Sequence, residues 1–463
     1  MHDVIVIGAG ISGLTAGWQL KQSGAQVLVL EAQPRHGGNV RTIARDGFRM
    51  EAGPTSFMGS SEFLRNLIEQ LGMTAEAEPA SAASDCRYIL REGRLMPVPL
   101  GCRSFIRTPL LSFRAKLRLM IEPFIPAGGQ PADTAWDFFV RRFGTEAATY
   151  LMGPFISGVY AGDPRLLGAR ASFPKFWAFE KNSGSMIVGA LKHMREKHRR
   201  LRRQGVTPWK GLFSIRDGLG RLTDRLAAGL NGDLLLGVPV SGLRREGTSW
   251  RAASPRDSWL ARSIVVATPP AQAARLLSEE LAGGASLLDD IPMAPVALAH
   301  WSQPETADGV TYPAGFGFLT PRLGQVRTLG TIFTSQLFAN RAPEGARLFS
   351  SFYGGMLDPG FLTQSDAAIA DLVQREHGAW FGGTLPRPGL MSVLRYPAAI
   401  PQLLPDHLER IDAVRGAARK TPGLFLAGNY LHGVGMEHAV MSGHEACRET
   451  ARFLSGGCCA AGS

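Results

Sequence analysis

The sequence predicts an α/β protein organised around a Rossmann-type βαβ unit, and three observations predict this class. An apolar strand at residues 4–7 runs directly into a glycine-rich turn and then a helix at residues 14–22. A second apolar strand follows at residues 26–30 and completes the unit. Strands with glycine-rich turns return after residue 211 and after residue 423. Because strands and helices alternate, we expect a mostly parallel sheet.

The length of 463 residues exceeds what one ordinary hydrophobic core supports, so we expect several intermixed units. The first is a discontinuous Rossmann-type dinucleotide-binding domain. The second is an α+β substrate-binding domain inserted into the first, and the third is a mainly helical region that is a candidate for membrane association. Their expected bounds are residues 1–80, 211–270 and 421–463 for the first, 81–103 and 271–420 for the second, and 104–205 for the third.

The composition is that of a globular protein with a large interior, since 45% of the residues are hydrophobic and 19% are charged. No apolar run reaches the roughly 18–20 residues needed to cross a bilayer. The first strand also starts too early to leave room for a cleavable leader. We therefore expect a cytoplasmic protein, or one bound peripherally to the inner face of a membrane. Five cysteines without metal-ligand spacing predict reduced thiols and no metal site.

Positive charge is concentrated in one short stretch of a chain whose net charge is +11. Residues 192–203 hold seven Lys or Arg residues against the single acid Glu196. Such a cluster attracts polyanions, but no nucleic-acid-binding signature accompanies it, so we expect no nucleic-acid partner. Two interpretations of this basic cluster remain, which are a site that binds an anionic membrane surface and an ordinary helix end exposed to solvent. Residues 104–124 add a second mixture of basic and apolar side chains that suits a membrane interface.

The turn after the first strand is a G-x-G-x-x-G sequence. Because it lies between a strand and a helix, this motif indicates a dinucleotide-binding site. A diphosphate can approach the backbone at such a turn, and the helix that follows offers free N–H groups and a partial positive charge. Glu31, at the end of the second strand, can accept hydrogen bonds from ribose hydroxyls. The candidate diphosphate contacts are Gly8, Gly10, Ile11, Ser12 and Gly13.

A second glycine-rich turn follows the second strand and distinguishes between dinucleotides. Gly37 and Gly38, with Asn39 beside them and Arg41 shortly after, resemble the second flavin-binding motif of the amine-oxidase-like FAD superfamily. The glycines let the chain pass against the cofactor, and Arg41 is placed to offset diphosphate charge. A surface salt bridge is the other interpretation of Arg41. The motif favours FAD over a nicotinamide cofactor.

The C-terminal segment supports the same resemblance, because a strand there ends in a glycine-rich turn that leads into a helix. The superfamily likeness implies that the N-terminus of this helix faces the flavin, where its dipole favours a reduced, anionic ring. It also implies that Val238 contacts adenine through backbone groups. The attachment position holds no Cys, which predicts non-covalent FAD. The candidate contacts are Val238, Gly428, Asn429, Val434, Gly435 and Met436.

More specific motifs lie in the middle of the chain. Residues 154–164, followed by residues 169–174, are similar to the central signature of oxygen-dependent protoporphyrinogen oxidases. The likeness runs from residue 1 to about residue 454, which is nearly the whole chain. Further blocks similar to that family are residues 315–319, 329–333, 338–343, 399–402 and 407–410.

This resemblance implies a six-electron oxidation of a porphyrinogen to a porphyrin in haem or tetrapyrrole biosynthesis, with FAD as the hydride acceptor and O2 as the final one. Both protoporphyrinogen IX and coproporphyrinogen III stay open as substrates, and so does a homodimeric state. The chemistry needs a flat apolar slot against the flavin and a cation for a propionate. The resemblance assigns that cation to Arg103, with Arg107 as the alternative.

Four other slot residues follow from the same resemblance. Leu319 and Ile332 match an aliphatic pair that clamps one pyrrole ring, and Phe352 matches an aromatic side chain that stacks on another. Gly158 is small where the family's backbone lies near the macrocycle. Ordinary core packing is the alternative role for each of these residues.

One motif departs from the family pattern. Met436 and Glu437, with Ala439 shortly after, are closer to the monoamine-oxidase form of the C-terminal turn. Gly435, however, stands where amine oxidases carry an aromatic residue of their substrate cage. Another FAD-dependent amine or polyene oxidase of the same fold is therefore the second hypothesis. A non-catalytic flavin-binding scaffold is a third, which the intact cofactor motifs disfavour.

Overall fold

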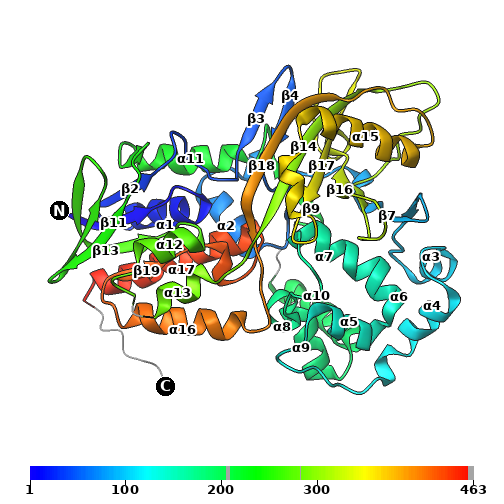
Figure 1. Ribbon diagram of the computed structural model, residues 1–463. Coiled ribbons are helices and arrows are strands. Elements are labelled where there is room, and N and C mark those ends of the chain that lie inside the picture. The colour runs from blue at the N-terminus through cyan, green and yellow to red at the C-terminus, as the bar shows by residue number, and fades with distance from the viewer. Residues whose placement is uncertain (205–208, 282, 457–463) are drawn as a thin grey trace.

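The computed structural model describes residues 1–204, 209–281 and 283–456. Two seven-stranded sheets and a group of helices make up the molecule. Figure 1 shows the first sheet with its helices on the left, the second sheet at the upper right and the helical region at the lower right. The chain is thus a mixed α/β protein, as the alternating pattern predicts.

The first sheet draws its strands from three distant parts of the chain, in the order β10-β2-β1-β13-β12-β11, with β19 paired to β13. Its central strands run parallel, and β1 and β2 are apolar on both faces because helices cover both sides. The strands are β1 (His2–Ile7), β2 (Val27–Glu31), β10 (Leu234–Leu236), β11 (Gly242–Glu246), β12 (Ser249–Ala253), β13 (Ser258–Val266) and β19 (Leu424–Leu426).

Two helix layers enclose this sheet, each with its own hydrophobic core. On one side α1 and α17 pack so closely that a Cβ atom on Gly443 would collide with the backbone of Ser12. That layer consists of α1 (Ile11–Gln22), α2 (Glu62–Gln70), α11 (Gly220–Leu230) and α17 (Met436–Leu454), and the other of α12 (Pro270–Leu276), α13 (Gly284–Asp289) and α16 (His407–Arg419).

The second sheet has the order β18-β14-β17-β16-β15-β7-β8. One face packs on α15 (Asp366–Phe381) through an aromatic core that includes Trp301, Phe349 and Phe381. The other face turns toward the first domain, where His300 Nε2 lies 3.1 Å from the carbonyl oxygen of Glu51. The strands are β7 (Arg87–Arg91), β8 (Arg94–Pro97), β14 (Met293–Pro304), β15 (Gly317–Leu319), β16 (Thr328–Ile332), β17 (Ala346–Gly354) and β18 (Gly389–Pro401), and the short helix α14 (Thr334–Leu337) precedes β17.

Smaller pieces join the two domains. A hairpin follows the second glycine-rich turn, and a three-stranded sheet in the order β5-β9-β6 lies beside it. These strands are β3 (Thr42–Arg45), β4 (Phe48–Glu51), β5 (Phe57–Met58), β6 (Ala77–Pro79) and β9 (Leu212–Ile215).

The helical region is held by an aromatic core and a buried ion pair. Phe139 meets Phe173 edge to face with ring centroids 5.0 Å apart, and fully buried Arg142 pairs with fully buried Glu122. None of the described helices is long and apolar enough to cross a membrane. The helices are α3 (Cys102–Arg107), α4 (Phe113–Met120), α5 (Ala135–Phe143), α6 (Thr145–Ala147), α7 (Gly153–Tyr160), α8 (Ala169–Ser172), α9 (Pro174–Ser183) and α10 (Met186–Gln204).

Candidate active site

The three glycines of the first turn have different surroundings. Gly8 has a φ of +102°, and a Cβ atom there would lie 2.7 Å from the carbonyl oxygen of Ala267. A Cβ atom on Gly13 would collide with the backbone of Gly8, so Gly13 brings α1 close to β1. Gly10 differs, since a Cβ atom there would meet no protein atom within 4 Å. The space beside Gly10 and the start of α1 is therefore open.

The second glycine-rich turn lies directly against the first. The amide N–H of Gly37 donates to the carbonyl of Ala9 at 2.8 Å, and Gly37 and Gly10 form a parallel bridge. Gly38 has a φ of +57°, and a Cβ atom there would lie 3.3 Å from the Cα atom of Gly10. The exposed backbone of Gly38 and Asn39 thus continues the open edge that begins at Gly10.

Arg41 follows this open edge in the chain, and its side chain contains a nitrogen atom without a hydrogen-bond partner in the part of the chain that the structure describes. Its Nε is buried and has no hydrogen-bond partner among the described residues, which costs free energy unless an anion arrives. A second cation, Arg35, donates from Nη1 to the carbonyl of Gly38 at 3.0 Å. Burial raises the pKa of the Tyr396 hydroxyl, while the charges of Arg41 and Arg35 oppose that rise. Tyr396 therefore lies beside both cations, and sequence reasoning did not find it or Arg35.

Glu31 is fixed at the end of β2 by the glycine-rich turn itself. Its Oε2 accepts a hydrogen bond from the amide of Ala9 at 2.7 Å, and its Oε1 accepts one from the amide of Gln33 at 2.8 Å. The amide of Val238 donates to the backbone carbonyl of Glu31 at 2.8 Å. Val238 thus lies beside Glu31, with its own N–H already engaged.

The N-terminus of α17 is the second helix end in this part of the molecule. The amide of Gly428 donates to Ser442 Oγ at 2.7 Å, and Asn429 Nδ2 donates to the carbonyl of Val434 at 3.5 Å. Gly435 precedes Met436, the first residue of the helix. The contact between Gly443 and α1 lies seven residues further on, which is roughly 10 Å along the helix axis. Because Ser12 lies in the first turn of α1, the two helices cross near the start of α1 and about two turns into α17.

Strand register places the predicted slot residues on one face of the second sheet. Leu319 pairs with Gly330, and Gly330 pairs with Phe352, so these three positions form one row across β15, β16 and β17. Directly paired residues share a face, and so do residues two apart in a strand. Ile332 therefore points the same way as Leu319 and Phe352. Gly330 carries no side chain, and the end of the Leu319 side chain lies over it, 2.8 Å from where a Cβ atom would be.

Gly158 contributes to the same place from α7. The side chain of Leu319 fills the space that a Cβ atom on Gly158 would need. Phe352 packs at the edge of a small cluster with Ala161, which caps α7, and with Leu329. All three predicted slot side chains are only partly buried. The structure thus brings Leu319, Ile332, Phe352 and Gly158 together.

Arg103 is placed differently. It is an exposed residue of α3, a helix that packs through Phe105 against Leu111 and Ala147 of the helical region. Within the described part of the chain, Arg103 forms no hydrogen bond or ion pair with the slot residues.

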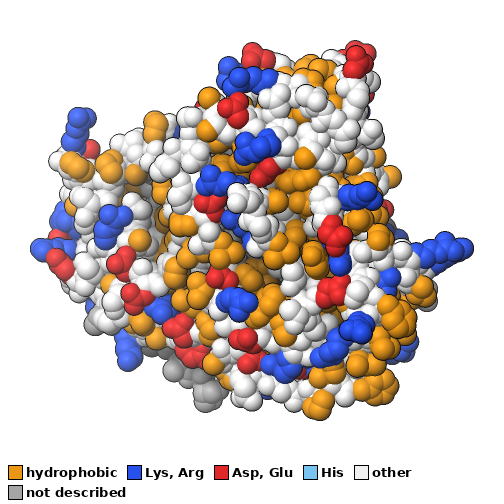
Figure 2. Space-filling view, turned by 45° about the vertical axis from the view of Figure 1, so that its right-hand side comes forward, with side chains coloured by type: hydrophobic (Ala, Val, Ile, Leu, Met, Phe, Trp, Pro, Cys, Tyr) orange, Lys and Arg blue, Asp and Glu red, His pale blue; other side chains and the backbone are white. Residues whose placement is uncertain are grey.

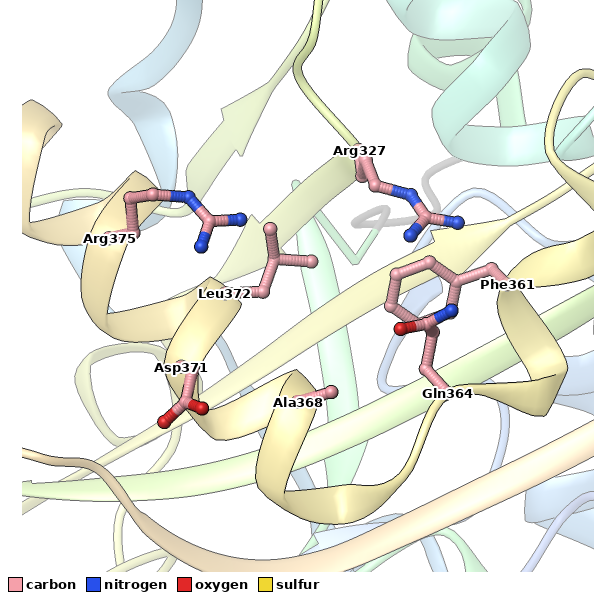
Figure 3. A pocket seen from close by; sticks show the side chains of 7 residues that line it. All are labelled: Arg327, Phe361, Gln364, Ala368, Asp371, Leu372 and Arg375. Atoms are coloured by element: carbon pink, nitrogen blue, oxygen red, sulfur yellow. The ribbon is translucent and has the colours of Figure 1, made fainter.

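A cavity of about 280 Å³ lies elsewhere in the second domain, between α15 and the turn that precedes it. Figure 3 shows the Arg375 side chain extending toward Leu372, whereas the guanidinium group of Arg327 lies over the ring of Phe361, 4.7 Å from its centroid. Arg327 is already held by Asp358 at 2.8 and 2.9 Å. None of the slot residues or glycine-rich turns lines this cavity, so it is separate from the candidate active site.

Comparison with known proteins decides the family. Residues 11–451 match the family of flavin containing amine oxidoreductases. The chain belongs to this family. A chloroplast protoporphyrinogen oxidase of Nicotiana tabacum is 32% identical over 98% of this chain and 86% of its own length. Coproporphyrinogen III oxidase of Bacillus subtilis is 28% identical over 97% of this chain and 98% of its own length.

Solved structures agree on the fold. A candidate protoporphyrinogen oxidase from Exiguobacterium sp. 255-15 superposes with a TM-score of 0.81 at 24% identity, with 98% of both chains covered. Cyclohexylamine oxidase from Brevibacterium oxydans IH-35A superposes with a TM-score of 0.71 at 19% identity and covers 98% of this chain. The mixed α/β fold of flavin containing amine oxidoreductases is therefore confirmed.

As a flavin containing oxidoreductase, the protein uses FAD, and the predicted cofactor class is confirmed. The residues present fit such a group on two observations. Open space beside Gly10 leaves room for a diphosphate against the backbone. The buried Nε of Arg41 has no hydrogen-bond partner among the described residues, and an anion such as a diphosphate could accept its hydrogen bond. The N-terminus of α1 adds positive potential to the same place.

Proposed function

We propose that the protein oxidises a porphyrinogen to the corresponding porphyrin in haem or tetrapyrrole biosynthesis. The observation that carries the proposal is the row of Leu319, Gly330 and Phe352, which places an aliphatic and an aromatic side chain on the face of the sheet that turns toward the dinucleotide-binding domain. Relatives that share almost the full chain are named protoporphyrinogen or coproporphyrinogen oxidases, and a flat macrocycle suits such a surface.

The cofactor roles proposed for the individual residues follow from their positions. The open turn would hold the diphosphate, with the cation Arg41 beside it, and Glu31 would accept hydrogen bonds from the adenosine ribose. The carbonyl of Val238 is the group left to contact adenine, because its N–H is engaged. The N-terminus of α17 would face the flavin ring. The full proposed set is Gly8, Gly10, Ile11, Ser12, Gly13, Glu31, Gly37, Gly38, Asn39, Arg41, Val238, Gly428, Asn429, Val434, Gly435 and Met436.

FAD supplies the hydride acceptor when it is bound, and we propose O2 as its oxidant. The chain's own contribution is to bind and orient the substrate. Phe352 would offer a stacking face, while Leu319 and Ile332 form the aliphatic wall beside it. Gly158 sets the depth of that wall, because it leaves room for the Leu319 side chain. Arg103 stays a proposed propionate partner that would need to approach from the exposed helix α3.

We also propose that the helical region rests on an anionic membrane surface. Figure 2 shows hydrophobic and basic side chains gathered together at its lower right edge. The exposed fractions of Phe113 and Phe124 are 80% and 85%, which is unusual for aromatic residues of a monomer. Basic residues surround them, so an interface that takes apolar side chains and attracts cations suits this surface. Between residues 100 and 124, the other exposed large apolar residues are Leu100, Ile106, Leu117, Met120 and Ile121.

The test is anaerobic mixing of the purified yellow holoenzyme with protoporphyrinogen IX, with coproporphyrinogen III and with a set of primary amines. Bleaching of the flavin absorbance by a porphyrinogen, and not by amines, is the expected result. Comparing the two porphyrinogens then assigns the substrate. Bleaching by amines alone would replace the proposal with the amine-oxidase hypothesis.

A further inference from the structure

The hairpin of β3 and β4 joins the cofactor turn to the second domain. Arg41 lies at its start, where its carbonyl accepts a hydrogen bond from the amide of Ala52 at 2.7 Å. Thr42 pairs with Glu51 across the hairpin. The backbone position of Arg41 therefore depends on what holds Glu51 and Ala52 in place.

Glu51 is a buried carboxylate with a complete set of donors. Its side chain belongs to a residue that is only 2% exposed. Its Oε1 accepts hydrogen bonds from Arg341 Nη1 at 3.0 Å and from the amide of Leu219 at 3.0 Å, while its Oε2 accepts one from Thr42 Oγ1 at 2.8 Å. Thr42 Oγ1 in turn accepts the amide of Gly220 at 3.0 Å. This one carboxylate thus joins the hairpin to the N-terminus of α11.

Arg341 is the cation that balances this carboxylate, and it comes from the second domain. It is 1% exposed and lies in the loop between α14 and β17. Its Nη2 donates to Ser214 Oγ at 2.9 Å and to the carbonyl of Ile215 at 3.3 Å. Its own carbonyl accepts the amide of Arg49 in β4 at 3.0 Å. One side chain and its backbone therefore fix the hairpin on two sides.

We infer that Arg341 is a positioning residue of the cofactor site, which balances the buried Glu51 carboxylate and thereby holds Thr42 and the Arg41 backbone in register with the two glycine-rich turns. The inference rests on the proposed placement of the FAD diphosphate beside Arg41. It gives a role to a sequence block, residues 338–343, that the slot and the glycine-rich turns leave unexplained.

The charged and titratable groups around Glu51 determine how the loss of Arg341 would change the pKa of Glu51. Burial raises the pKa of Glu51, and the Arg341 charge is the largest influence against that rise. Beside the backbone carbonyl of Glu51, burial lowers the pKa of His300 to about 4, so His300 is neutral above that pH. The charged groups on adjacent elements include Arg41 beside Tyr396 and three ion pairs, which are Arg49 with Asp217 at 3.3 Å, Arg45 with Asp46 at 3.3 Å and Arg221 with Glu76 at 3.0 Å.

The sign of the effect follows from linkage. Without Arg341 the pKa of Glu51 rises further, so the folded cofactor site favours a protonated Glu51. The folded site is stable at low pH, where Glu51 is protonated. It loses stability as pH rises through the higher pKa, because the buried carboxylate must then either ionise without a balancing cation or keep its proton at a cost in free energy. Measured from pH 5.5 to pH 8.5, the FAD affinity of Arg341→Met should therefore fall relative to that of wild type as pH rises, with about a tenfold loss for each further unit by which the pKa of Glu51 is raised.

The experiment measures the dissociation constant of FAD from flavin fluorescence across that pH range, with far-UV circular dichroism to check folding. Arg341→Lys keeps the charge and should keep the wild-type pH profile. Arg341→Met with Glu51→Gln removes the titrating group, so its affinity deficit should be independent of pH. Arg387→Met, which breaks an exposed ion pair of the same domain with Asp371, is the matched control and should change nothing.

A parallel pH profile for Arg341→Met and wild type would overturn the inference, as would a pH-dependent deficit that survives Glu51→Gln. Should Arg341→Met fail to fold, Glu51→Gln alone must lower FAD affinity, and unchanged affinity there overturns the inference instead. Gly10→Val separates this from the proposed cofactor site. Full FAD binding by Gly10→Val would reject the site itself, whatever Arg341 does.

Discussion

Phe352 and Tyr353 are consecutive residues of β17 whose side chains lie on opposite faces of the second sheet. Phe352 shares a row with Gly330 and Leu319 on the partly exposed face. Tyr353 is fully buried on the other face, where its ring stacks on Phe361 with centroids 4.6 Å apart. Because side chains alternate along a strand, a shift by one residue would exchange the two roles.

This arrangement predicts different effects for the two residues. Phe352→Ala should lower kcat/KM for the porphyrinogen by roughly tenfold, since aromatic stacking contributes about 0.5–1.5 kcal/mol beyond the buried area. FAD content should stay at the wild-type level. Tyr353→Phe is the control, because it removes only a hydroxyl that has no hydrogen-bond partner among the described residues. Steady-state kinetics that show the larger loss in Tyr353→Phe would reject the slot.

Gly158 and Leu319 should respond as a coupled pair. Gly158→Ala places a Cβ atom where the end of the Leu319 side chain now lies, so Leu319 must move into the slot. We expect KM to rise severalfold with little change in FAD content. Leu319→Ala should relieve the conflict, so the double variant should be better than the sum of the two single effects predicts. Strictly additive effects on kcat/KM would show that the two residues do not meet in the working enzyme.

Gly10→Val tests the cofactor turn with little disturbance to the protein. A Cβ atom at this position meets no protein atom within 4 Å, so the variant should fold. The new side chain would, however, occupy the space proposed for the diphosphate, and FAD binding should be lost. Gly416→Val, at a helix position that is equally open, is the matched control and should keep its FAD. Absorbance of the purified proteins at the flavin band gives the result directly.

Stability should fall in acid because of a buried histidine. Burial lowers the pKa of His377 to about 3, well below its ordinary 6.5. The unfolded chain therefore binds a proton that the folded chain rejects, and stability is lost as pH falls from about 6.5 toward 3. The slope for one such group is about 1.4 kcal/mol per pH unit. In denaturant titrations, the stability gap between wild type and His377→Gln should narrow by that amount per unit below pH 6, and a constant gap would contradict the assignment.

Membrane association should depend on the exposed aromatic residues as well as on charge. Replacing Phe113 and Phe124 together by Ser removes apolar area that is already in solvent, so folding should be unaffected. Binding to vesicles that contain anionic lipid should fall at least tenfold if these rings enter the interface. Flotation with neutral vesicles is the comparison. If the double variant binds anionic vesicles as tightly as wild type, the two phenylalanine rings do not contribute to membrane binding and only the basic side chains attract the membrane.

The cofactor turns were predictable because their meaning is local. Gly8, Gly10 and Gly13 stand next to the strand and helix that they connect, so spacing alone indicates their surroundings. The predicted helix start at residue 14 was late, since α1 begins at Ile11 directly after the turn. A helix that must present its first N–H groups to a ligand has no separate capping residue, which is why the usual sequence signal is missing.

The domain interface was not predictable in the same way. Glu51 and Arg341 are 290 positions apart, and nothing in the spacing of either residue indicates the other. The slot residues came from family resemblance, which supplied their identity but not the row through Gly330 that joins Leu319 to Phe352. Arg103 stays a prediction from resemblance, and its exposed position on α3 is a feature that the sequence did not indicate.

The close crossing of α1 and α17 at Gly443 has a consequence for the order of folding. More than four hundred residues separate these two helices, yet they pack in one layer on the first sheet, which also receives β19 shortly before α17. Because this layer needs both helices, β1 and α1 keep an apolar flank uncovered until the segment that contains α17 has been synthesised. The helix layer behind the first glycine-rich turn is therefore completed only after the second sheet and the helical region have been made.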